Sequence, residues 1–126
     1  MDSQKELEDK YKQKTIDRAL SVNLSDGIYI VFYYNETYSN NNNQINIFQI
    51  FKSKSRNEIQ EWIERCRKLL TSNYEVGDAL VEMANQKVAS SIRYEKAREE
   101  LIKNNPGFSE ETYAHVIHLG ASFACH

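Results

Sequence analysis

The stretch that decides the fold reads IYIVFYY from Ile28 to Tyr34, and a second apolar run, INIFQIF, follows from Ile45 to Phe51. Four asparagines, Asn40–Asn43, stand between the two runs. Aromatic and β-branched residues favour strands, and a polar stretch between two such runs favours a turn. The sequence therefore predicts one β-hairpin. Because two strands alone are at best marginally stable in water, we expect helices to cover the hairpin.

Outside the hairpin, helix propensity and capping signals predict helices. A first helix is expected over Ser3–Leu20, where basic and acidic residues alternate and the apolar stripe is thin. After the second apolar run, Ser55 precedes Glu58 by three residues, the spacing at which a hydroxyl and a carboxylate satisfy two backbone donors at a helix start. Apolar residues then recur at helical spacing as far as Leu70, on a face that includes Cys66.

The carboxy-terminal half predicts two more helices. Ser72 and Glu75 repeat the capping spacing and open a long helix that is expected to run to about Lys103, before a proline–glycine turn. Ser109 is the expected N-cap of the last helix. That helix contains Gly120, whose small size allows close approach of a neighbouring helix.

In order, these elements are helix, strand, strand, helix, long helix, helix. The expected fold is α+β, mostly helical, with one β-hairpin packed on four helices, and the length of 126 residues predicts a single domain over 1–126. The chain has 16 Lys+Arg against 18 Asp+Glu, a net charge of -2, which argues against nucleic-acid binding. A charged amino terminus and the lack of a long apolar run predict a cytoplasmic protein without membrane contact.

The sequence offers little for catalysis or metal binding. His115 and His118 lie three apart on the last expected helix, with Cys125 and His126 nearby, but an ExxH motif is missing. A half-exposed polar face explains these residues better than a metal site does. Cys66 is expected to act as a small core hydrophobe. Since no nucleophile–base pair and no phosphate-binding loop is present, we expect no enzyme activity, no metal and no cofactor.

Tyrosines provide the candidate binding surface, because a tyrosine joins a large apolar area to a polar tip and is enriched at interfaces. Tyr29 and Tyr33 share one face of the first expected strand. This face suits a core position against the helices and a contact with a partner equally well. Tyr34 and Tyr38, at the strand end and on the loop, are expected to contact a partner. An acidic group near the carboxy terminus is expected to meet a basic partner. It consists of Glu95, Glu99, Glu100, Glu110 and Glu111.

The carboxy-terminal tail carries a resemblance to a known class of proteins. Its segments Asn105–Tyr113 (NPGFSEETY) and Ile117–Ala124 (IHLGASFA) resemble the tails of small bacterial immunity proteins that pair with secreted polymorphic toxins, as in contact-dependent growth inhibition. The resemblance is confined to these segments. It implies a cytoplasmic, non-enzymatic protein that binds and neutralises one cognate toxin domain, and it assigns no binding residue.

Two other functions remain as alternatives, and the chain could also form a homodimer. A nucleic-acid-associated regulatory protein would use Lys52, Lys54 and Arg56 with the hairpin aromatics to hold a single strand by charge and stacking. An enzyme of unrecognised type is the third hypothesis. The long helix or the unpaired hairpin edge also allows a homodimer.

Overall fold

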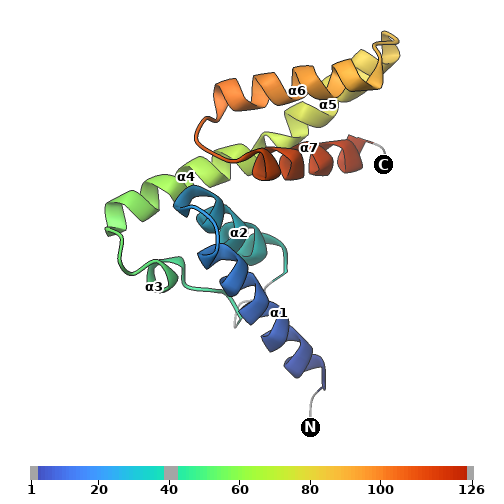
Figure 1. The fold of residues 1–126 in the computed structure, drawn as a ribbon. Coiled ribbons are helices and arrows are strands. Elements are labelled where there is room, and N and C mark those ends of the chain that lie inside the picture. Colours follow the sequence, from blue (N-terminus) through green and yellow to red (C-terminus); the bar gives the residue numbers. More distant parts are fainter. Residues whose placement is uncertain (1–2, 39–42, 125–126) are drawn as a thin grey trace. The chain divides into compact units, whose positions relative to one another are not determined.

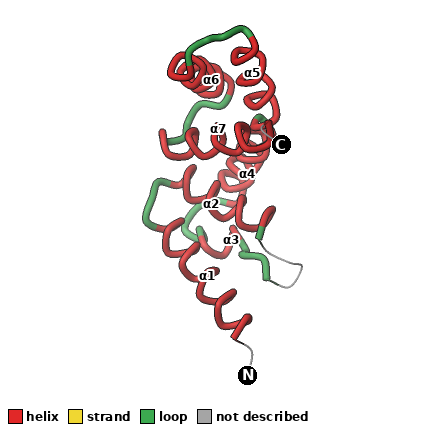
Figure 2. Tube along the Cα trace, turned by 90° about the vertical axis from the view of Figure 1, so that its right-hand side faces the viewer, coloured by secondary structure: helices red, strands yellow, loops and turns green. Residues whose placement is uncertain are grey.

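The computed structural model describes residues 3–38 and 43–124, and every regular element in these ranges is an α-helix (Figure 1, Figure 2). By internal packing the chain divides into two compact units, Met1–Cys66 and Arg67–His126. The first unit contains α1 (Ser3–Leu20), α2 (Leu24–Thr37), α3 (Ile47–Ile50) and most of α4 (Arg56–Thr71). The second contains the end of α4, then α5 (Asn73–Asn85), α6 (Ser90–Asn104) and α7 (Glu110–Ala124). The boundary between the two units falls inside α4, so one continuous helix runs through both of them. The single domain expected over 1–126 stays a prediction.

The predicted β-hairpin is wrong, and the predicted α+β fold with it, because the described residues contain no strand. The run from Ile28 to Tyr34 lies inside α2, and the run from Ile45 to Phe51 contains only the short helix α3. A continuous apolar run of this length fits a buried helix as well as a buried strand. Asn40–Asn42 lie outside the described residues.

Helix α2 forms because its start is capped and nearly all of its sides are covered. The Asn23 side chain accepts a hydrogen bond from the Asp26 backbone N–H at 3.2 Å, which satisfies a donor at the helix start. Ile28 and Val31 are 0% exposed. At Gly27 the helix backbone lies so close to the Ala19 carbonyl of α1 that an added Cβ would collide with it. A helix that is apolar all round belongs in the interior, where packing overrides strand propensity.

The second apolar run is joined to α2 through the side chain of Asn35, which directly follows the first run, rather than through a strand ladder. The Asn35 side chain on α2 donates from Nδ2 to the Ile45 carbonyl at 2.9 Å and accepts from the Ile45 N–H at 2.8 Å. One amide thus satisfies both backbone groups of the residue that begins the second run. This pair holds the segment before α3 against α2.

The predicted starts of α1, α4 and α7 are confirmed, whereas at the start of α5 the predicted capping hydrogen bond is not formed. Ser55 Oγ accepts from the Glu58 N–H at 3.1 Å at the start of α4, and α1 and α7 begin where the sequence indicates. At α7, Ser109 Oγ lies 3.5 Å from the Thr112 N–H. Ser72 precedes α5 as expected but does not cap it, because its Oγ donates to the Lys68 carbonyl at 2.9 Å.

The predicted long helix is wrong, because the chain turns between α5 and α6. The Val88 N–H bonds to the Met83 carbonyl and the Lys87 N–H to the Ala84 carbonyl, each at 3.0 Å. These two bonds form a Schellman motif, whose turning residue adopts a left-handed conformation and is usually glycine. Here it is Lys87, with φ of 61°. The sequence lacks the glycine that marks such an ending, so the break could not be read from it.

Close helix contact in the second unit depends on two glycines. A Cβ built on Gly77 of α5 would lie 2.5 Å from the Gly120 carbonyl oxygen of α7, and one on Gly120 would lie 2.5 Å from the Asn73 carbonyl oxygen. Real Cβ atoms do not approach this closely, so the two backbones touch here. The predicted close approach at Gly120 is confirmed.

None of the helices in the described ranges combines the length and the hydropathy that a membrane crossing requires.

Candidate functional site

An exposed aromatic surface lies on the first unit, at the start of α1 and the end of α2. We define the tyrosine patch as Leu7, Tyr11, Tyr33 and Tyr38. The Tyr38 ring is at its centre, with its centroid 5.5 Å from that of Tyr11 and 5.9 Å from that of Tyr33, both nearly edge to face. Tyr38 is 57% exposed, Tyr11 42% and Leu7 63%. The rings therefore brace one another while they present a large apolar area to solvent.

Tyr34 supports the patch but does not form its surface. Its ring is 3% exposed and lies 5.7 Å from Tyr11 and 6.5 Å from Tyr38, measured between centroids. The Asn43 side chain donates to its hydroxyl at 3.4 Å. Of the two tyrosines that the sequence assigns to partner contact, the structure exposes only Tyr38.

The surroundings of Tyr33 and Tyr34 favour the protonated form of these two hydroxyls. Burial raises the pKa of Tyr34 above its usual range, and the nearby ring of Tyr11 and the carboxylates of Glu8 and Asp9 raise it further. Burial also raises the pKa of Tyr33. Neutral hydroxyls both donate and accept hydrogen bonds, so the patch suits a mixed apolar and polar contact rather than proton transfer.

The five predicted acidic contact residues are exposed, but three of them are engaged within the second unit. Arg98 on α6 donates from Nε to Glu110 on α7 at 2.8 Å and from a second nitrogen to the same carboxylate, and its Nη1 bonds to Glu95 at 3.1 Å. These bonds lower the pKa of Glu110. Glu100 accepts from the Asn104 side chain at 3.3 Å. Of these residues, Glu110 ties α7 to α6, while Glu95 and Glu100 bond to partners within α6 itself. The acidic group lies in the second unit and Tyr38 in the first, so the structure does not bring them together in one unit.

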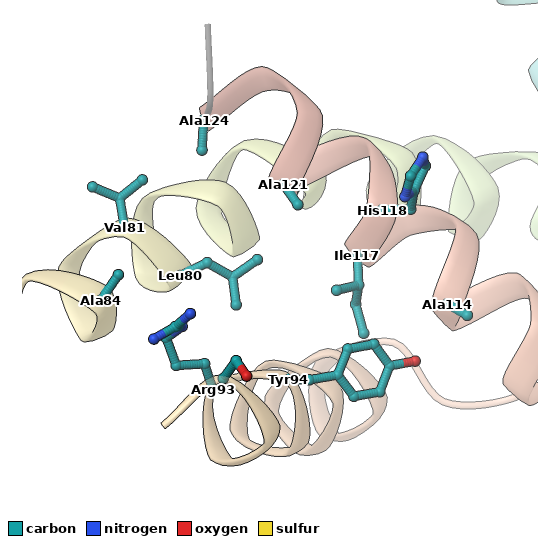
Figure 3. A pocket seen from close by; sticks show the side chains of 11 residues that line it. Leu80, Val81, Ala84, Arg93, Tyr94, Ala114, Ile117, His118, Ala121 and Ala124 are labelled. Atoms are coloured by element: carbon teal, nitrogen blue, oxygen red, sulfur yellow. The ribbon is translucent and has the colours of Figure 1, made fainter. Parts of the chain in front are cut away.

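A groove opens in the second unit between α5, α6 and α7, with a cavity volume of about 600 Å³ (Figure 3). Its walls are mainly apolar, and the described residues that line it include no Asp or Glu. Ile117 and Tyr94 face each other across it in Figure 3. The lining consists of Leu80, Val81, Ala84, Ser90, Arg93, Tyr94, Ala114, Ile117, His118, Ala121 and Ala124.

The groove lies along the first part of α6, which contains no buried residue. The buried residues of α6, Ala97 and Leu101, lie in its second half, where the Arg98–Glu110 pair also ties it to the start of α7. None of the residues 90–96, at the start of α6, is buried. Across from it, α7 presents the small side chains of Ala114, Ala121 and Ala124, which leave the space between the helices unfilled.

The residues considered for metal binding and nucleophilic catalysis do not form a site in the described part of the chain. Residues 3–38 and 43–124 contain no group of three or more His, Cys, Asp or Glu side chains that could hold a metal ion. Cys66 is 0% exposed, as predicted for a core residue, and burial raises the pKa of its thiol to about 12. Cys125 and His126 lie outside the described residues.

The sequence analysis did not predict Leu7 and Tyr11 as contact residues of the tyrosine patch, and it did not predict the groove of the second unit. Leu7 and Tyr11 are four residues apart on the first predicted helix, a spacing that places them on one face, so this half of the tyrosine patch could have been found. The groove could not, because it depends on the turn at Lys87. Comparisons of the chain with protein-family models, with curated proteins and with solved structures find no match.

Proposed function

We propose that this chain is a non-enzymatic protein-binding domain, and that it acts as an inhibitory partner of a toxin domain. The observation that carries the proposal is the tyrosine patch, in which Tyr38 and Tyr11 are exposed but held by neighbouring rings. Tyrosines lose few rotamers on binding and are frequent hot spots of interfaces. The inhibitory role rests on the tail resemblance to immunity proteins.

The nucleic-acid alternative would hold a single nucleic-acid strand with Lys52, Lys54, Arg56 and the aromatic residues of the predicted hairpin. That hairpin is not present, since residues 43–124 contain no β-strand. The Arg56 guanidinium lies over the Phe48 ring, 4.1 Å from its centroid, so this aromatic face is already covered by a side chain of the same unit. We therefore favour the protein-binding proposal.

The binding proposal is tested with the protein encoded by the neighbouring gene, by isothermal titration calorimetry against purified chain. We expect Tyr38→Ala to weaken binding by at least about 30-fold, the loss typical of a hot-spot residue of about 2 kcal/mol. Tyr74→Ala is the matched control, because Tyr74 is a tyrosine of similar exposure, 58%, in the other unit. Equal losses in the two variants, or none in Tyr38→Ala, would contradict the assignment of the patch.

The inhibitory role needs a separate experiment. Cells that express the toxin domain of the neighbouring protein should survive when they also express the chain, and Tyr38→Ala should lower that protection at equal protein level. If the chain binds the domain tightly but gives no protection, the protein-binding proposal stands and the inhibitory role is refuted.

A further inference from the structure

The groove of the second unit has a charge pattern that indicates its ligand. We propose that it binds a free single-chain amphiphile with a carboxylate head, of the fatty-acid type, with the carboxylate at Arg93 and the tail along Leu80, Ile117 and Ala121. This binding site shares no residue with the tyrosine patch, and it does not depend on the proposed function.

Arg93 is the group that would hold the carboxylate. It is half-buried on the first turn of α6, and Figure 3 shows its side chain beside Leu80 and Ala84. Its Nη1 donates to the Val88 carbonyl, and no carboxylate of the described residues forms an ion pair with it. A guanidinium has five N–H donors in a fixed fork that matches a carboxylate. Most of this capacity is unused at the groove wall.

The rest of the groove suits an alkyl chain. Its volume of about 600 Å³ falls within the range of roughly 300–1,000 Å³ typical of small-molecule sites. Ile117 is 3% exposed and forms part of the floor, while Ala84 and Ala121 are short enough to leave the space open. Burial of an alkyl chain here removes apolar surface from water, so each further CH₂ group that fits the groove should strengthen binding.

The charges favour a monomeric amphiphile over a membrane surface. Attachment to an anionic membrane requires a cluster of several basic residues, whereas only Arg93 and His118 carry basic groups at this groove. The apolar lining is also recessed between three helices rather than raised on one helix face (Figure 3). A single chain can enter such a groove, and a bilayer cannot.

The test measures binding of dodecanoate to the full chain by isothermal titration calorimetry, below the micelle-forming concentration. Butyrate has the same head and a short tail, and dodecyltrimethylammonium has the same tail and the opposite charge. We expect saturable one-to-one binding of dodecanoate and at least about tenfold weaker binding of both other probes, because the first lacks apolar area and the second lacks the ion pair.

Variants assign the binding to the groove. Arg93→Gln should weaken dodecanoate binding about tenfold or more, the equivalent of one charge-assisted pair of about 1.4 kcal/mol. Lys96→Gln removes the same charge from an exposed position of α6 that does not line the groove and should have no effect. Ala84→Trp fills the groove from an exposed position and should abolish binding. Unchanged circular dichroism and thermal unfolding would show that each variant is folded.

Several results would overturn the proposal. They are equal affinity for dodecanoate and dodecyltrimethylammonium, equal losses in Arg93→Gln and Lys96→Gln, and binding only to micelles or lipid vesicles. A folded Ala84→Trp variant with full affinity would place the ligand elsewhere. If a leucine- and glutamate-rich helical peptide binds in the groove and dodecanoate does not, the groove takes a partner helix instead.

Discussion

At the scale of single residues, burial rather than residue type separates the tyrosines. Tyr34 and Tyr38 are only four residues apart in the sequence, yet the first is 3% exposed and the second 57%. Both are rich in apolar area, so composition alone assigns both to a contact surface. Only the packing of α1 on α2 shows that one ring is a support and the other is available to a partner.

Tyr34→Ala is therefore expected to destabilise the fold, by about 3 kcal/mol, as truncation of a large buried aromatic side chain does. Tyr38→Ala should lower the free energy of unfolding by less than about 1 kcal/mol, since most of its ring is in solvent. Urea unfolding of the two variants measures both values. Similar losses would show that Tyr38 is a core residue and that the patch is not a free surface.

Burial of Cys66 should make the free energy of unfolding depend on pH in the alkaline range. The pKa of its thiol is about 12 in the fold, against about 8.5 in an unfolded chain. Above about pH 8.5 the thiol loses its proton in the unfolded chain but keeps it in the fold, which favours unfolding. The contribution of Cys66 to the free energy of unfolding is therefore fully present below about pH 8.5 and is lost as the pH rises toward 12. Between about pH 8.5 and pH 10, the free energy of unfolding should fall by up to about 2 kcal/mol in a reduced Cys125→Ser background. Adding Cys66→Ala should flatten this fall, and an equal slope in both proteins would contradict the assignment.

At the scale of elements, local signals were reliable where a side chain caps a helix and failed where packing made the decision. Ser55 and the start of α7 were found because capping is a contact between close neighbours in sequence. The end of α5 was missed because Lys87 occupies a position that normally belongs to glycine. Helix α2 was missed because the apolar run that fills a helix interior also fits a strand.

Lys87→Gly should stabilise the chain by about 1 kcal/mol, because glycine adopts a positive φ without the steric cost that a Cβ carries. Lys87→Ala keeps the Cβ and is the control, with no comparable gain expected. Thermal or urea unfolding gives the comparison. If glycine destabilises the chain or alanine stabilises it equally, the turn at Lys87 is not the strained point that its φ of 61° indicates.

At the scale of the whole molecule, the two candidate surfaces belong to different compact units. The tyrosine patch lies in Met1–Cys66 and the groove in Arg67–His126. Their chemistry also differs, since one exposes aromatic rings and the other an apolar cavity with an arginine. We infer that each serves its own ligand.

Variants should therefore separate the two activities. Tyr38→Ala should weaken partner binding and leave the dodecanoate affinity within about twofold of the wild type, and Ala84→Trp should do the reverse, because the two sites share no residue and belong to different units. Calorimetry of both variants with both ligands provides the test. A variant that impairs both bindings while it remains folded would show that the two surfaces form one site.

The sequence by itself determined the helices at 3–20, 56–71 and 110–124, the core position of Cys66 and the close contact at Gly120, because capping, helical periodicity and side-chain size are local properties. Only the tertiary structure decided that Ile28–Tyr34 is helical, that Tyr34 is buried and that a groove opens beside α6. Each of these depends on which surfaces cover one another, and contacts between residues distant in sequence leave no local signal.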